Sequence, residues 1–134
     1  MIVGLGVDIV DINRIEFVIK KWGKKFLRRI FTSREINYCQ QHSNSFQHFA
    51  ARFAAKEAIF KVFGTGWRNI SWQEVEIINN SMGKPEVKLN GNAKLIAEKM
   101  IIQNIHISLS HEKTYAIAQA IAEGGNKSDF TAAG

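Results

Sequence analysis

Residues 49–66 read FAARFAAKEAIFKVFGTG and give the clearest helix signal in the chain. We expect a helix over residues 46–63, with Gly64 and Gly66 ending it. At about 100° per residue, one narrow stripe of this helix carries four residues: Ala50, Ala54, Glu57 and Lys61. An adjacent stripe is apolar and is expected to be core: Phe49, Phe53, Phe60 and Phe63. Two charged side chains should therefore emerge beside the core, next to alanines that let another element come close.

The segments on both sides of this helix predict an α+β fold. Residues 2–10 (IVGLGVDIV) read as a buried strand, with Gly4, Gly6 and Asp8 on one face and Val3, Leu5, Val7 and Ile9 on the other. Further helices are expected over 13–30 with a break near Gly23, over about 33–41 after the capping box of Thr32 and Glu35, and over 92–102. Strands are expected at 74–78, 86–89, 105–110 and 115–121. Strands adjacent in sequence and mixed with helices predict a small antiparallel or mixed sheet packed with helices.

Length and composition predict a single domain. The chain has 134 residues, of which 46% are hydrophobic, and it contains one cysteine, Cys39. We expect one domain over residues 1–122 and a disordered tail over 123–134. The N-terminus lacks the basic leader of a signal peptide, and no apolar run approaches the ~18 residues that span a bilayer. These features predict a cytoplasmic protein with an inert, unpaired Cys39.

The positive charge of the chain is concentrated in one segment. Between Arg14 and Arg34 there are eight basic residues and one acidic residue, Glu16, so this segment carries a charge of +7. The net charge of the whole chain is +6, so the rest of the chain carries −1. Such a patch attracts an acidic partner. A solvated helix face is the plainer interpretation. A nucleic-acid-binding module that uses residues 14–34 is the main functional alternative, but it gives no role to Asp8 or Glu57.

Asp8 and Glu57 form a candidate site for a hard cation. A carboxylate at the end of an apolar strand is costly to bury without a partner. Two carboxylates, completed by phosphate oxygens and water, suit Mg²⁺, and Lys61 could neutralise phosphate charge one helical turn away. Two plainer interpretations stay open: Asp8 or Asp11 could cap the following helix, and Glu57 and Lys61 could be an ordinary i,i+4 pair.

Two glycine turns and one histidine add weaker signals. Gly64-Thr65-Gly66 and Gly83-Lys84-Pro85 could approach a phosphate group, although a plain helix C-cap explains the first turn better and a hairpin turn is the plainer interpretation of the second. His111 stands at a predicted strand end, where a structural role is the usual one. The chain has no zinc spacing and no nucleotide-binding motif of the GxGxxG or GxxxxGK[ST] kind.

Two motifs together give a specific family resemblance. Gly6-Val7-Asp8, combined with Arg52-Phe53-Ala54-Ala55-Lys56-Glu57-Ala58-x-x-Lys61, resembles the 4'-phosphopantetheinyl transferase superfamily. Phe63-Gly64-Thr65-Gly66, Gly83-Lys84-Pro85 and Ser108-Leu109-Ser110-His111 are similar to segments of its holo-[acyl-carrier-protein] synthase branch. The resemblance covers roughly residues 1–122. It implies transfer of 4'-phosphopantetheine from coenzyme A to a serine of apo-acyl carrier protein in fatty acid biosynthesis, with release of 3',5'-ADP.

The resemblance also implies roles for individual residues. The catalytic residues would be Asp8, Glu57 and Lys61: the two carboxylates would bind Mg²⁺ and the lysine would contact phosphate. The coenzyme A site would be lined by seven residues, some of them from a neighbouring subunit of a homotrimer: Arg52, Lys61, Gly64, Gly83, Lys84, Pro85 and His111. The acyl carrier protein would be held by Arg14, Lys21, Lys25 and Arg28. Some relatives carry basic residues where this chain has Ser43, Asn44 and Ser45.

Overall fold

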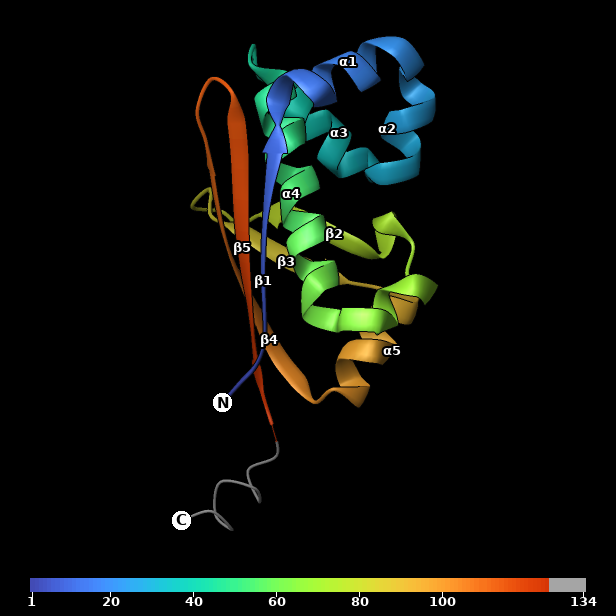
Figure 1. Ribbon diagram of the computed structural model, residues 1–134, viewed down its shortest axis with the longest axis vertical. Coiled ribbons are helices and arrows are strands. Elements are labelled where there is room, and N and C mark those ends of the chain that lie inside the picture. Colours follow the sequence, from blue (N-terminus) through green and yellow to red (C-terminus); the bar gives the residue numbers. More distant parts are fainter. Residues whose placement is uncertain (126–134) are drawn as a thin grey trace.

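The computed structural model describes residues 1–125, and of residues 65–67 it describes the backbone alone. Its elements follow the chain as β1 (Ile2–Asp11), α1 (Ile12–Trp22), α2 (Lys24–Ile30), α3 (Ser33–Gln40), α4 (Ser45–Phe63), the 3₁₀ turns η1 (Gly64–Asn69) and η2 (Trp72–Glu74), β2 (Val75–Asn79), β3 (Pro85–Leu89), α5 (Gly91–Lys99), β4 (Ile102–His111) and β5 (Tyr115–Gly124). The strands form two antiparallel sheets, β1-β5-β4 and β2-β3. The expected α+β architecture is confirmed (Figure 1).

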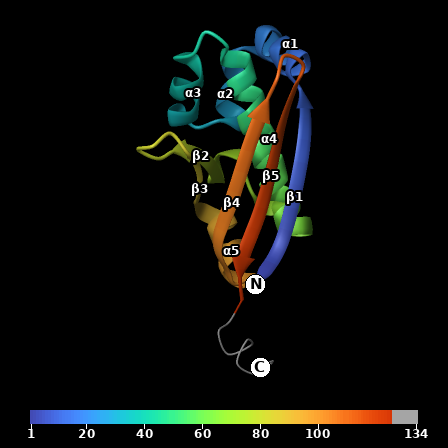
Figure 2. The same cartoon turned by 90° about the vertical axis from the view of Figure 1, so that its left-hand side faces the viewer.

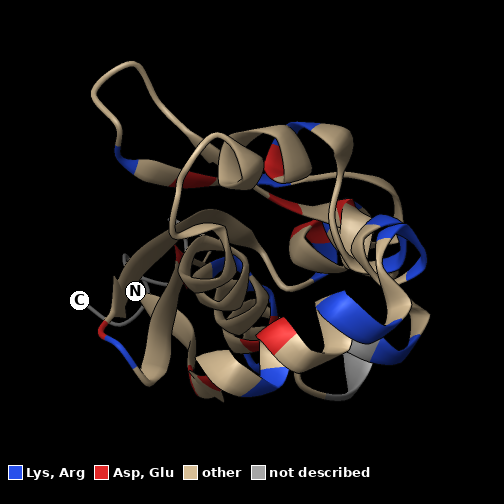
Figure 3. Ribbon diagram, turned by 90° about the horizontal axis from the view of Figure 1, so that it is seen from above, with Lys and Arg blue, Asp and Glu red and all other residues tan. Residues whose placement is uncertain are grey.

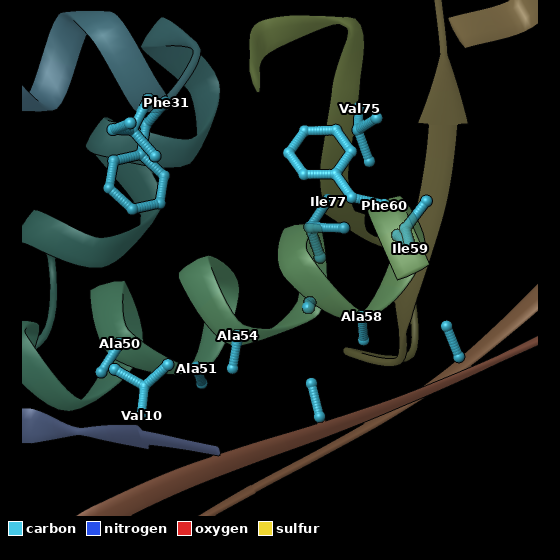
Figure 4. Packing of buried hydrophobic residues seen from close by; sticks show 14 of the residues in the cluster. Val10, Phe31, Ala50, Ala51, Ala54, Ala58, Ile59, Phe60, Val75 and Ile77 are labelled. Atoms are coloured by element: carbon cyan, nitrogen blue, oxygen red, sulfur yellow. The ribbon is translucent and has the colours of Figure 1, made fainter. Parts of the chain in front are cut away.

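Helix α4 packs on one face of the three-stranded sheet through small side chains (Figures 1 and 4). The buried hydrophobic residues of β5 are all alanines: Ala116, Ala118, Ala120 and Ala122. The buried alanines of α4 are Ala50, Ala51, Ala54, Ala55 and Ala58. A Cβ added to Gly6 would lie 1.9 Å from the Ala58 carbonyl oxygen, and one added to Gly4 would lie 2.9 Å from Val62 Cγ1. The two glycines therefore let β1 approach the helix backbone.

The other face of β1 corrects one expectation. The strand was expected to be buried, yet Leu5, Val7 and Ile9 are 61%, 54% and 61% exposed. The reason is that the helices cover only the glycine face of the sheet, while its second face is open in a single chain (Figure 2). The half-exposed Tyr115 and Ile117 of β5 extend this apolar surface.

The aromatic stripe of α4 faces the rest of the chain. Phe49, Phe60 and Phe63 are buried, as expected, whereas Phe53 is only half-buried. Phe49 packs against Phe31, with ring centroids 5.1 Å apart. Val75 and Ile77 of β2 belong to the same core (Figure 4). Helix α4 thus joins the sheet on one side to the remaining elements on the other.

Most element boundaries follow the expected signals, although β4 (Ile102–His111) begins before the strand expected at 105–110. Gly23 separates α1 from α2 at a φ of 56°, and the capping box at the start of α3 is present. The helix expected over 92–102 is too long: α5 ends at Lys99, since Ile101 turns the chain with a φ of 56° into β4. Strand β5 continues to Gly124, past the expected end of the domain at 122. Residues 126–134 of the expected tail lie outside the described residues.

Candidate functional site

Asp8 lies on the face of β1 that meets α4. Asp11, not Asp8, caps α1, because its Oδ1 accepts a hydrogen bond from the Asn13 backbone N–H at 2.9 Å. Asp8 instead forms an ion pair with Lys61, whose Nζ is 3.2 Å from Asp8 Oδ1 and donates to the Val7 carbonyl at 2.8 Å. Asp8 Oδ2 is buried without a hydrogen-bond partner among the described residues. Asp8 therefore does not serve as the helix cap, and one of its carboxylate oxygens pairs with Lys61.

Glu57 is electrostatically coupled to Asp8. Burial, and then the negative charge of Asp8, raise the pKa of Glu57 from 4.5 to about 7, while Lys61 and Arg14 act in the opposite direction. Within residues 1–125, Lys61 forms its ion pair with Asp8 of β1 and not with Glu57, its i,i+4 neighbour in α4. Two carboxylates thus share a poorly solvated position in which a second negative charge is unfavourable.

This pair of carboxylates fits a divalent cation with oxygen ligands. A buried carboxylate oxygen without a donor, beside a second carboxylate that resists ionisation, is what a bound cation would satisfy. No group of three or more His, Cys, Asp or Glu side chains converges within the described part of the chain. Asp8 and Glu57 could therefore hold a metal such as Mg²⁺, which commonly takes its other ligands from water and phosphate.

An apolar cavity opens beside these charged groups. It has a volume of about 470 Å³ and is lined by Glu57, Phe60, Lys61, Gly64 and Trp72. The Trp72 ring stacks on Phe53 at 5.1 Å and meets Phe60 edge-on at 4.9 Å. Sequence reasoning identified Gly64 here but missed Trp72, since η2 lies outside every motif and its approach to α4 is a tertiary contact.

Arg52 lies in a different region, at the β2–β3 hairpin. It is 3% exposed, its guanidinium lies 4.0 Å from the centroid of the Tyr38 ring, and it donates to Asn79 Oδ1 at 2.5 Å. The Asn79 amide in turn donates to the Gly83 carbonyl at 3.0 Å. Arg52 Nε is buried and has no hydrogen-bond partner in the described residues. Arg52 is thereby linked to the glycine turn that the sequence had singled out.

His111 joins the same region through two histidines that sequence reasoning missed. The His48 ring lies 4.0 Å from His42 and 5.5 Å from His111, and Tyr38 packs against both His42 and His48. Burial, followed by the charges of His42, Arg52 and His111, lowers the pKa of His48 to about 4. The only available signal in the sequence was the close spacing of His42 and His48 along the chain.

The expected coenzyme A residues therefore fall into separate groups. Lys61 and Gly64 line the cavity beside Asp8 and Glu57. Arg52, Gly83 and His111 gather around Tyr38 and Asn79. Lys84 and Pro85 border a third hollow of about 450 Å³, between β3 and β4.

Basic residues are concentrated along α1 and α2 (Figure 3), and we call this stretch the basic patch. All four residues expected to hold a partner are exposed: Arg14, Lys21, Lys25 and Arg28. Two aromatic residues that the sequence did not single out, Phe17 and Trp22, are 64% and 54% exposed among them, and Lys21 Nζ lies 5.9 Å and 5.3 Å from their ring centroids. Arg14 is near enough to Glu57 to affect its pKa, so the patch reaches the carboxylate pair.

Comparison with known proteins identifies the family. A sequence model described as the 4'-phosphopantetheinyl transferase superfamily matches residues 4–120. The chain belongs to this superfamily. It is 43% identical over 125 residues to a protein of Halothermothrix orenii (strain H 168 / OCM 544 / DSM 9562) described as a holo-[acyl-carrier-protein] synthase, with 93% of this chain and 100% of that protein covered.

Solved structures of phosphopantetheinyl transferases share the fold. The crystal structure of holo-[acyl-carrier-protein] synthase from Neisseria meningitidis matches with a TM-score of 0.84 at 36% identity, covering 92% of this chain and 99% of that one. The enzyme of Bacillus anthracis str. Ames, in complex with CoA (3',5'-ADP), matches with a TM-score of 0.75 at 36% identity, covering 93% and 99%. These relatives do not support the nucleic-acid-binding alternative.

Cys39 is buried and, as the only cysteine of the chain, forms no disulfide within it. Burial raises the pKa of the Cys39 thiol to about 12, which agrees with an inert side chain.

None of the helices in residues 1–125 has both the length and the apolar character needed to span a bilayer.

Proposed function

We propose that this chain transfers the 4'-phosphopantetheine group of coenzyme A to a serine of apo-acyl carrier protein, releasing 3',5'-ADP, as fatty acid biosynthesis requires. The observation that carries the proposal is the pairing of Asp8 and Glu57, with Lys61, at the edge of a cavity in a chain of this superfamily. The complex of the Bacillus anthracis relative with CoA (3',5'-ADP) supports the same donor.

In this proposal Asp8 and Glu57 hold Mg²⁺. The metal, when bound, neutralises charge on the diphosphate of coenzyme A. The hydroxyl oxygen of the carrier serine attacks the β-phosphorus, and the bond from that phosphorus to the oxygen of 3',5'-ADP breaks. Lys61 stabilises the phosphate charge, because its ammonium is half-exposed beside Asp8. Glu57 is our candidate for the general base that accepts the proton of the serine hydroxyl, because it lies beside Asp8 and Lys61 at the edge of the cavity.

We assign the remainder of coenzyme A to the region around Arg52 and His111. The buried Arg52 has a free Nε, and the adjacent turn carries Gly83, Lys84 and Pro85. His42 and His48 could supply hydrogen bonds in place of the basic residues that some relatives have at Ser43–Ser45. The expected coenzyme A residues lie apart in one chain, since Lys61 and Gly64 line one hollow and Lys84 and Pro85 line another, which favours a coenzyme A site completed by a neighbouring subunit.

We propose that the chain forms a homotrimer through the open face of its sheet. Leu5, Val7, Ile9 and Ile117 expose a continuous apolar surface there, and such surfaces are typical of subunit interfaces. The basic patch around Arg14 would hold the acidic carrier protein at the edge of the shared site. A cytoplasmic location is part of the same proposal.

A single assay tests the transfer. The protein is mixed with apo-acyl carrier protein, coenzyme A and Mg²⁺, and the carrier is weighed by mass spectrometry. We expect a gain of one phosphopantetheine group, its loss when a chelator removes the metal, and no gain with Glu57→Gln. A parent protein that binds RNA or DNA tightly but never adds mass to the carrier would overturn the proposal.

A further inference from the structure

A fully buried ion pair lies beneath the candidate site. Lys56 Nζ of α4 is 2.9 Å from Glu35 Oε1 of α3, and both side chains are 0% exposed. Burying two charges costs several kcal/mol per ion, and an apolar pair of similar volume is often equally stable or more so. The mutual attraction of the two charges therefore does not by itself explain why this pair lies in the core, and the backbone groups that the pair binds are the relevant feature.

Lys56 fixes the backbone of the η2 turn at both ends. Its ammonium donates to the Trp72 carbonyl at 3.0 Å and to the Val75 carbonyl at 2.6 Å. Glu35 completes the arrangement, because its Oε2 accepts from the Ile77 N–H at 2.9 Å and its Oε1 accepts from the Thr32 N–H at 2.8 Å. The ion pair thus ties η2 and β2 to α3 and α4 through charge-assisted hydrogen bonds, which are stronger than neutral ones.

The segment held in this way carries one wall of the cavity. The Trp72 ring, stacked on Phe53 and in contact with Phe60, lines the same cavity as Glu57 and Lys61. Lys56 precedes Glu57 directly in α4. Lys56 therefore binds the backbone that carries Trp72, and the next residue, Glu57, supplies a carboxylate to the same cavity.

We propose that Lys56 and Glu35 are positioning residues that hold Trp72 as the wall of the coenzyme A cavity. The inference rests on the proposed transfer reaction. If the turn is released, the ring no longer keeps a fixed separation from the phosphate-binding groups, so binding of the donor weakens. This turn touches the basic patch at the end of α2, where the Gln73 amide donates to the carbonyls of Arg28 and Phe31, so we expect recognition of the carrier protein to change less than binding of coenzyme A.

The test replaces both charges together. In Glu35→Met/Lys56→Met the apolar pair fills similar volume, but the backbone groups of Trp72, Val75 and Ile77 lose their partners, so we expect Tm to fall and the kinetics are measured well below it. Because a lost contact in an apolar pocket commonly costs roughly 10-fold or more in binding, we expect KM for coenzyme A to rise about 10-fold while KM for the carrier changes less than about 2-fold. Lys99→Met, an exposed lysine on α5, is the matched control and should behave like the parent.

A spectroscopic measurement separates positioning from general stability. With Trp22 and Trp67 replaced by Phe, Trp72 is the single tryptophan, and its quenching by acrylamide should rise in the double variant at temperatures well below Tm. Trp72→Leu keeps the ion pair and removes the indole, so it should raise KM for coenzyme A to a similar extent. This variant decides the question if the double variant does not fold.

The outcomes are distinguishable. An unchanged KM for coenzyme A in a folded double variant, or in Trp72→Leu, would overturn the positioning role even though the parent is active. A parent protein without transfer activity would instead overturn the proposed function.

Discussion

Gly6→Ala tests whether the close approach of β1 and α4 sets the catalytic geometry. The added Cβ would lie 1.9 Å from the Ala58 carbonyl oxygen and 2.8 Å from the Ala58 carbonyl carbon, both backbone atoms of α4. Ordinary contact begins at 3.4 Å, so strand and helix must separate by roughly 1.5 Å. Overpacking of this kind costs about 1–3 kcal/mol. For a chain of this length we expect Tm to fall by roughly 3–15 °C.

The activity of Gly6→Ala should fall further than its stability. Asp8 follows Gly6 on the same face of β1, while Glu57 and Lys61 are carried by the helix that must move. A displacement of ~1 Å can cost ~100-fold in rate, so we expect a loss of about that size per folded molecule. The readouts are thermal unfolding and transfer of phosphopantetheine measured by mass.

Gly124→Ala is the matched control. Its added Cβ would lie 1.9 Å from the Ile101 carbonyl oxygen, an equally close backbone contact, but at the opposite end of β5 from the residue that pairs with Asp8. We expect a similar fall in Tm with activity per folded molecule close to that of the parent. Equal specific activities in the two variants would refute the argument that the contact of Gly6 with α4 aligns the site.

Three other predictions concern the metal site, the assembly and the partner. Burial and the Asp8 charge raise the pKa of Glu57 from 4.5 to about 7, so the unfolded chain loses this proton at a lower pH than the folded protein does. The free energy of unfolding of the metal-free protein should therefore fall as pH rises from 4.5 through 7. Unfolding measured across this pH range should show that Glu57→Gln removes the fall. Sedimentation equilibrium should give three times the 15.2 kDa chain mass for the parent and a smaller species for Leu5→Asp, whose charge would be buried in the interface; a parent monomer with full activity would contradict the shared site. Arg14→Glu should raise KM for the carrier at least 10-fold and leave KM for coenzyme A within 2-fold, whereas unchanged carrier kinetics would exclude a docking role for the patch.

The helices and the charged trio were predictable because they depend on local pattern and chemistry. The 3.6-residue period of α4 identified the stripe that carries Glu57 and Lys61, and the cost of burying Asp8 indicated a partner for it. Lys56 and Trp72 were beyond sequence reasoning. Nothing local distinguishes Lys56 from a surface lysine, and its burial depends on a carboxylate from α3 and on two carbonyls about η2 that only the tertiary fold brings to it.

The burial of β1 failed as a prediction for a physical reason that concerns assembly. Alternation correctly separated a glycine face from an apolar face, but the hydrophobic pattern alone does not say which face meets the chain's own helix. The alanines of α4 select the glycine face, since only that face permits the approach seen at Gly6. The apolar face is then left for another surface, which we propose is a second subunit.

One residue of β1 connects that proposed interface to the candidate site. The Val7 side chain is 54% exposed on the open face, while its backbone carbonyl accepts the hydrogen bond of Lys61 at 2.8 Å. Lys61 also pairs with Asp8, the next residue along the strand. A subunit that packs against Val7 would therefore hold the backbone to which Lys61 is anchored. The same strand would then supply both the contact between subunits and the alignment of the phosphate-binding lysine, which is a physical reason for activity to depend on assembly.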